Sequence, residues 1–270
     1  MCETLKKLVF VGLGLHDEMG ISLRGLEETR KADSVFMELY TSLLPDFSLT
    51  HFEEVCGKKV QVLSRHDIED DNSERMLFEA EHGRVVFLVP GDPLIATTHV
   101  ALRIEAARRG IKTLVVHGAS VLSAVIGLSG LHSYKFGKTV TIPFSDGVPS
   151  ETPYEVISEN SRRGLHTLCL LDIRANEKRY MNIHDALTAL LEVEAKREEG
   201  IIAAGTLSIG IARAGSEDPQ VKAGLVEDLL EYDFGKPPHA MIIPGRLHFT
   251  EAEALVVLSG APKALLEASR

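Results

Sequence analysis

The sequence has no tryptophan, few cysteines and no long apolar run. Cys2, Cys56 and Cys169 are odd in number, lie far apart and lack Cys-x-x-Cys or Cys/His spacing, which argues against a disulfide framework and against a zinc site. No apolar stretch reaches the roughly 18 to 20 residues that span a bilayer, and the first residues lack a cleavable signal pattern. We therefore expect free thiols, no metal, no membrane association and a cytoplasmic location.

Positive charge is also scarce, because 29 Lys and Arg face 39 Asp and Glu and leave a formal charge of −10. Binding to a nucleic-acid backbone depends on basic patches that release counterions. The negative excess excludes broad binding of this kind, so we expect no nucleic-acid partner. We interpret the acidic cluster from Asp67 to Asp71 as a solvated loop rather than a metal site.

What the chain does contain is a run of five apolar residues, Val85 to Val89, followed by Pro90-Gly-Asp-Pro93 and a helical pattern. The run is too short for a typical helix and rich in β-branched residues, so it predicts a strand buried on both faces. Thr97 or Thr98 is expected to cap the following helix. Ligands of open α/β sheets bind at the carboxyl ends of strands, which places Asp92 where a ligand would lie. The alternative is a surface turn whose Asp caps a local amide.

The same order of strand, small-residue turn and helix occurs at two other places in the first half. Leu8 to Val11 leads into Gly12 and Gly14, and Lys112 to His117 leads into Gly118-Ala-Ser120. This repetition predicts a mostly parallel, doubly wound sheet with right-handed crossovers. A dinucleotide fold would carry Gly-x-Gly-x-x-Gly after the first strand, but Asp17 occupies the sixth position and weakens a nicotinamide-dinucleotide interpretation.

The rhythm changes after residue 130, where Gly- and Pro-containing segments interrupt the strand and helix alternation. We therefore divide the chain into an N-terminal α/β domain, residues 1–117, and a C-terminal α/β domain, residues 118–270. Strands are predicted at Leu165 to Ile173, Thr206 to Ala212 and Ala240 to Ile243. Some connections between them are too short for full crossovers, so the second sheet is expected to be mixed.

Several motifs spread along the chain resemble one family, the diphthine synthases of archaeal type, which are S-adenosylmethionine-dependent methyltransferases of the tetrapyrrole-methylase fold. The motifs are Val11-Gly-Leu-Gly-Leu15, Glu38-Leu-Tyr-Thr-Ser42, the segment Pro90 to His99, Tyr134-Lys-Phe-Gly-Lys138, Gly164 to Thr167 with Leu171-Asp-Ile-Arg174, Ala212-Arg-Ala-Gly-Ser216, and Asp233 to His239. Porphyrinoid methyltransferases share the Gly-Asp-Pro turn but carry Gly-x-Gly-Pro-Gly-Asp after the first strand. Because this chain has Gly-Leu-Gly-Leu-His-Asp there, porphyrinoid C-methylation is the alternative rather than the first interpretation.

The resemblance implies two α/β domains of the tetrapyrrole-methylase type, with the donor S-adenosyl-L-methionine held in the interdomain cleft and S-adenosyl-L-homocysteine as its product. It also implies a homodimer. Carried over position by position, the cofactor-binding residues would be Leu15, Asp92, Ile95, Ser120, Val121, Ile173, Ala214 and His239. Several of these are apolar, which suits recognition of adenine by backbone groups and an apolar wall.

The implied protein substrate is elongation factor 2, whose modified histidine carries a 3-amino-3-carboxypropyl group. Its amino group would be methylated repeatedly to give diphthine, a step in diphthamide biosynthesis. An α-amino group has a pKa of about 8, so a neutral fraction of the amine exists without a strong base. Catalysis would then depend mainly on positioning. The catalytic residues are unknown, with Asp17, Tyr40 and His99 as candidates at the rim. A non-catalytic nucleotide-binding module is a further alternative.

Overall fold

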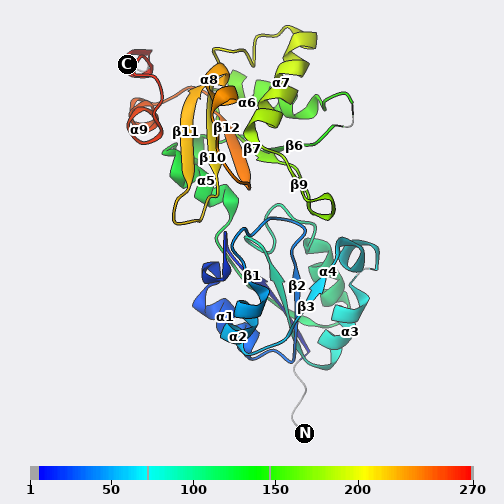
Figure 1. Ribbon diagram of the computed structural model, residues 1–270. Coiled ribbons are helices and arrows are strands. Elements are labelled where there is room, and N and C mark those ends of the chain that lie inside the picture. Colours follow the sequence, from blue (N-terminus) through cyan, green and yellow to red (C-terminus); the bar gives the residue numbers. More distant parts are fainter. Residues whose placement is uncertain (1–5, 72, 146, 269–270) are drawn as a thin grey trace. The chain divides into compact units, whose positions relative to one another are not determined.

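The computed structural model describes residues 6–71, 73–145 and 147–268, which form two compact units (Figure 1). Unit 1 runs to Val121 and includes Ala175–Glu177, and unit 2 comprises the rest. The strands of unit 1 are β1 (Lys7–Gly12), β2 (Ser34–Glu38), β3 (Val60–Leu63), β4 (Arg84–Val89) and β5 (Lys112–Val116). Its helices are α1 (Leu23–Arg30), α2 (Leu49–Cys56), α3 (Glu74–His82) and α4 (Val100–Arg108), with short turns η1 (Glu18–Gly20), η2 (His66–Asp70) and η4 (Ala175–Glu177).

The unit 1 sheet has the order β3-β2-β4-β1-β5, and every pair in it is parallel. Helices cover both faces, with α1 and α2 on one side and α3 and α4 on the other (Figure 1). The alternation of side chains along β1 separates two cores: Phe10 packs toward α3 and α4, and Val9 packs toward α2. The predicted doubly wound parallel sheet is confirmed.

Unit 2 contains a mixed sheet in the order β11-β10-β12-β7-β6. Its strands are β6 (Val140–Ile142), β7 (Thr167–Leu171), β10 (Leu207–Ala212), β11 (Gln220–Leu225) and β12 (His239–Ile243), and β8 (Ile173–Arg174) pairs with β9 (Arg179–Tyr180) as a small hairpin. Only β6 and β7 pair in parallel within the five-stranded sheet; the other neighbours are antiparallel. The predicted mixed sheet is confirmed, although β6 and β11 were not expected from the sequence.

Six helices accompany this sheet in the described residues: α5 (Val121–Ser129), α6 (Thr152–Arg162), α7 (Ile183–Arg197), α8 (Val226–Glu231), α9 (Phe249–Ser259) and α10 (Leu265–Ala268), with a short turn η3 (Ser133–Lys135). Helices α6, α7 and α8 enclose the main core with Tyr154, Leu187 and Leu229. The strand predicted from Leu165 to Ile173 is wrong in extent, because β7 ends at Leu171 and Ile173 begins the β8–β9 hairpin. Asp172 makes the break: its carboxylate accepts the Phe144 N–H at 2.9 Å.

Two other expectations need correction or comment. The threonine cap is wrong, since His99 precedes α4 without a side-chain cap and Thr97 Oγ1 instead donates to the Pro93 carbonyl at 3.1 Å. Cys56 and Cys169 are free and buried, and Cys2 lies outside the described residues. Across those residues, we find no helix with the length and apolar character that crossing a bilayer requires.

Candidate functional site

Glycines from three strand ends meet at the carboxyl edge of the unit 1 sheet, and we call Gly12, Gly14, Gly91 and Gly118 the glycine junction. Gly14 and Gly91 exchange two backbone hydrogen bonds, of 3.2 and 2.7 Å. A Cβ on either Gly12 or Gly118 would lie 2.4 Å from the Gly91 carbonyl oxygen. Three loops can therefore pack backbone against backbone only because these positions lack side chains.

One side of the glycine junction is open. Apart from its two chain neighbours, a Cβ added to Gly91 would meet no described atom closer than Ala119 O at 3.9 Å, although the Gly91 backbone has the left-handed φ of 69°. A ligand could therefore approach the backbone of Gly91 at van der Waals distance. This combination of tightly packed loops and a bare outer side is what close recognition by backbone groups requires.

Asp92 lies directly beside the junction and is 6% exposed. Its Oδ1 accepts the Leu94 N–H at 3.1 Å, so the local cap considered from the sequence exists. Its Oδ2 accepts a hydrogen bond from His117 Nδ1 at 2.6 Å. His117 was missed by the sequence reasoning, which treated it as the last residue of a strand; its place at a carboxyl end next to Gly118 was the available signal.

The other residues assigned to unit 1 by resemblance follow the same three adjacent strands, β4, β1 and β5. Leu15 is half-buried in the loop after β1, and Ile95 is 43% exposed after β4. Ser120 and Val121 are half-buried where α5 begins after β5. The fold thus gathers these four residues and Asp92 at the carboxyl ends of neighbouring strands.

The three catalytic candidates have different environments. Asp17 caps η1 by accepting the Met19 N–H at 2.9 Å, which is a local structural contact. Tyr40 lies just beyond β2; burial raises the pKa of its hydroxyl, and the described residues offer the hydroxyl no hydrogen-bond partner. The catalytic role of each remains a prediction.

His99 is 1% exposed and lies beneath the Pro93 turn. Its Nδ1 donates to the Pro93 carbonyl at 3.2 Å, and its Nε2 is buried without a partner among the described residues. Burial lowers the pKa of His99, so a neutral imidazole is favoured. His99 therefore contacts the Pro93 turn through Nδ1, and its catalytic role stays a prediction.

The residues assigned to unit 2 also share one edge of a sheet. β7 and β10 end where β12 begins, because Leu170 pairs with Ala240 and Ala212 pairs with His239. Ile173 follows β7, Ala214 follows β10 and His239 opens β12. His239 Nε2 donates to the Lys236 carbonyl at 3.1 Å, and burial lowers the pKa of His239, which favours the neutral ring.

Strained backbone marks the same places. Among the described residues, six non-glycine residues have a positive φ, and His16, Ala96 and Arg213 are three of them, at 78°, 56° and 53°. Each is adjacent in sequence to a residue assigned to donor binding, namely Leu15, Ile95 and Ala214. Such conformations cost of order 1–3 kcal/mol and concentrate at functional sites. The positive φ angles of His16, Ala96 and Arg213 are a feature of the backbone, separate from the family resemblance, and they lie in the same loops as the residues that the resemblance implies.

A second polar cluster, here called the Glu251 network, lies in unit 2 and consists of Glu251, Lys135, His166 and His132. Glu251 is fully buried. Its carboxylate accepts hydrogen bonds from the Lys135 ammonium, from the backbone N–H of His132 at 2.8 Å and from His166 Nε2 at 3.1 Å. Burial alone would raise the pKa of Glu251, but the His248 amide, Lys135 and the other donors lower it to about 2. Every member is used internally, so the network has a structural function.

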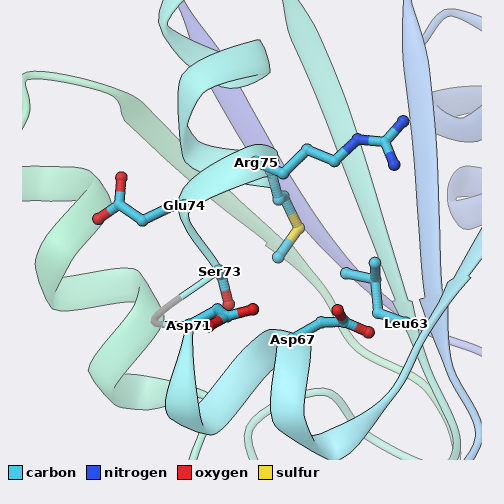
Figure 2. A pocket seen from close by; sticks show the side chains of 7 residues that line it. Leu63, Asp67, Asp71, Ser73, Glu74 and Arg75 are labelled. Carbon is cyan, nitrogen blue, oxygen red and sulfur yellow. The ribbon is translucent and has the colours of Figure 1, made fainter.

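An exposed hollow between β3 and α3 contains the acidic cluster predicted to be solvated. Figure 2 shows Asp67 and Asp71 beside Ser73, with Glu74 and Arg75 directed away from them. Ligand atoms of His66, Asp67 and Asp71 lie within 4.8 Å of one another, and all three residues are exposed. The Asp67 carboxylate instead accepts hydrogen bonds from the Ser64 N–H at 2.7 Å and from the Ser64 hydroxyl at 2.6 Å. Exposed acidic groups of this kind do not by themselves indicate a metal.

Comparison with known proteins decides the family. The model of the tetrapyrrole (corrin/porphyrin) methylases matches residues 7–230. A diphthine synthase of Methanosarcina mazei is 50% identical over 266 residues, covering 96% of this chain and 98% of its own. The chain belongs to the diphthine synthase family of tetrapyrrole methylases. The diphthine synthase of Methanocaldococcus jannaschii is 48% identical over 254 residues, which are 93% of this chain and 98% of that protein.

The structures of the diphthine synthase family agree. A crystal structure of diphthine synthase superimposes with a TM-score of 0.88 at 43% identity, covering 97% of this chain and 99% of that one. The predicted fold and the resemblance are thereby confirmed. Relatives across nearly the whole length are diphthine synthases, which does not favour a porphyrinoid methyltransferase or a non-catalytic module.

Proposed function

We propose that this protein uses S-adenosyl-L-methionine to methylate repeatedly the amino group of 3-amino-3-carboxypropyl-histidine on elongation factor 2, giving diphthine for diphthamide biosynthesis. The observation that carries the proposal is identity of about half over nearly the full length to diphthine synthases. The open glycine junction beside a buried carboxylate supports the proposal, because a cationic donor there would meet both backbone groups and a negative charge.

Both units supply donor-binding residues in this proposal: Leu15, Asp92, Ile95, Ser120 and Val121 from unit 1, and Ile173, Ala214 and His239 from unit 2. The donor supplies an electrophilic methyl group on a positively charged sulfonium. Asp92 provides a buried negative charge for that cation, and its two oxygens retain lone pairs besides those used by Leu94 and His117. The neutral His239 ring and the half-buried Ala214 offer an uncharged wall.

The work of the protein is mainly to align the amine lone pair with the methyl carbon, because the leaving group needs no activation. Alignment of this kind can supply several kcal/mol. The β2 loop is held for this purpose: Glu38 is buried and its Oε2 accepts the Tyr40 and Thr41 N–H groups at 2.8 and 3.0 Å. Glu38 thus fixes the segment that presents Tyr40. We further propose that the protein is a cytoplasmic homodimer.

The test is incubation of the purified protein with methyl-labelled donor and elongation factor 2 that carries the 3-amino-3-carboxypropyl group. We expect label on the modified histidine, with mass increments that correspond to successive methyl groups. Unmodified elongation factor 2 is the matched control and should stay unlabelled. Donor binding by calorimetry without any transfer would contradict the proposal, as would label on a porphyrinoid instead.

A further inference from the structure

His117 and Asp92 form a pair whose geometry resembles an oriented base more than a surface ion pair. His117 lies at the carboxyl end of β5 with its side chain 74% exposed, whereas the Asp92 side chain is 6% exposed. The buried Asp92 carboxylate contacts Nδ1 of His117 at 2.6 Å, while most of the imidazole ring is exposed to solvent. A largely buried carboxylate, that of Glu18, also contacts Nδ1 of the exposed His51, so what distinguishes His117 is its place beside the glycine junction.

The contact fixes the tautomer of His117. An ionised carboxylate only accepts hydrogen bonds, so Nδ1 must carry the proton that it donates to Asp92. Nε2 of the neutral ring then carries a lone pair, and the described residues give this nitrogen no hydrogen-bond partner. A proton accepted at Nε2 leaves the Nδ1–H contact with Asp92 in place. This is the relation between carboxylate and histidine that general-base catalysis uses on many folds.

Repeated methylation of an amine needs a proton acceptor. The substrate amine begins largely as R–NH3⁺, loses a proton, and its lone pair forms the bond to the methyl carbon while the carbon–sulfur bond breaks toward sulfur. The product R–NH2⁺–CH3 cannot react again until it loses a proton in turn. Three transfers to a primary amine therefore release three protons, and each must leave from the site where the next methyl arrives.

We propose that His117 is the catalytic base of this reaction and that Asp92, besides binding the donor, is its positioning residue. The inference rests on the proposed function. His117 Nε2 accepts the proton from the substrate ammonium group, the Asp92–His117 pair carries the added charge, and the exposed ring passes the proton to water before the next cycle. His117 directly precedes Gly118 and Asp92 directly follows Gly91, so the pair lies next to the glycine junction, where the donor is proposed to bind.

The test compares His117→Asn and His117→Ala with the wild-type enzyme on modified elongation factor 2. Asn can keep a donor for Asp92 where Nδ1 stood but has no group at the position of Nε2. We expect the turnover of both variants to fall at least about tenfold at neutral pH. This loss lies at or below the lower end of the range for general bases, because part of the substrate amine is already neutral. Donor affinity, measured by calorimetry, should stay within about twofold in the Asn variant.

Two further readouts separate a lost base from a lost structure. Added imidazole should restore part of the activity of His117→Ala, because the truncated side chain leaves room for it. It should restore none of the activity of His117→Asn, because the asparagine side chain occupies that room. The deficit should shrink above about pH 9, where solution supplies neutral amine. His184→Ala is the matched control, since His184 is an exposed histidine with a carboxylate of Asp185 at 3.9 Å; its activity should be unchanged.

The outcomes distinguish the two proposals. Absence of transfer by the wild-type enzyme would overturn the proposed function itself. Normal transfer by the wild-type enzyme together with normal turnover of His117→Asn would overturn only the assignment of the base. A fall in donor affinity that accounts for the whole loss of turnover would also overturn it, because His117 would then be part of donor binding alone.

Discussion

The glycine junction of unit 1 and the Glu251 network of unit 2 both contain motifs typical of the family, yet they use them in opposite ways. In the network, Lys135 of the Tyr-Lys-Phe-Gly-Lys motif contacts Glu251. Gly137 of the same motif lies outside the network, where a Cβ would be 2.1 Å from Asn160 Oδ1. These residues are consumed by contacts within the fold. At the junction, the backbone of Gly91 has free space beside it, and His117 contacts Asp92 through Nδ1 alone. A shared motif therefore identifies a family, and only the unused bonding capacity identifies a site.

The largest effect should come from breaking the network. Glu251→Ala removes the acceptor of Lys135 and His166, and we expect a loss of about 3 kcal/mol in the free energy of unfolding, as for other broken buried pairs. Donor affinity of the folded variant should be unchanged. Denaturant unfolding and calorimetry measure the two quantities, with Glu253→Ala, an exposed residue of the same helix, as the control. Lost donor affinity without lost stability would reverse the comparison.

The same network has a predicted pH signature. The pKa of Glu251 is lowered to about 2 in the folded protein, below the unfolded value of about 4.3. Its contribution to stability is therefore complete above the unfolded pKa and is lost as pH falls toward the folded pKa. The difference in unfolding free energy between wild-type and Glu251→Gln proteins should shrink between about pH 4.5 and pH 2. A constant difference would contradict the assignment.

The junction is tested by Gly118→Ala. The new Cβ would lie 2.4 Å from Gly91 O, so the loops after β4 and β5 must separate. We expect donor affinity to fall about 100-fold, or about 2.7 kcal/mol. Gly127→Ala is the control, because an added Cβ in α5 meets nothing within 4 Å. An unchanged dissociation constant in Gly118→Ala would show that the junction has no part in binding.

A smaller effect is expected at Asp92. Asp92→Asn keeps the shape of the side chain and removes the negative charge beside the proposed sulfonium. Donor affinity should fall about tenfold, equal to about 1.4 kcal/mol. Affinity for the uncharged-sulfur product, S-adenosyl-L-homocysteine, should fall less, since that compound lacks the sulfonium charge. Equal losses for both compounds would assign Asp92 to hydrogen bonding alone.

The smallest change should be Tyr40→Phe. The Tyr40 hydroxyl is buried with no partner among the described residues, so removing it should leave stability unchanged or raise it by a few tenths of a kcal/mol. Turnover should fall less than about tenfold if the hydroxyl contacts the substrate. A loss of stability would show that the hydroxyl is satisfied within the folded protein, and unchanged turnover would remove Tyr40 from the candidates.

Much of the fold followed from the sequence, because parallel strands buried on both faces leave continuous apolar runs such as Val85 to Val89. The strand β11 and the end of β7 did not follow. Gln220 to Leu225 lacks a strong apolar pattern and is a strand only through its pairing with β10, while Asp172 ends β7 by a tertiary hydrogen bond to Phe144. Local patterns carry no information about either contact.

The site divides in the same way. Gly12, Gly91 and Asp92 could be located because each follows a recognisable strand. The pairing of Asp92 with His117 could not, since 25 residues separate them and only the order β4-β1-β5 brings their loops together. The structural use of Asp17 and His99 was equally hidden, because capping and burial are decided by neighbours distant in the chain or by the final turn geometry.

The most direct test of the account is a crystal structure of the protein with S-adenosyl-L-homocysteine. We predict ligand density in contact with the backbone of Gly91 and the carboxylate of Asp92, at the open side of the glycine junction. Density in the hollow of Figure 2 or elsewhere, with this edge of the sheet bare, would contradict the account.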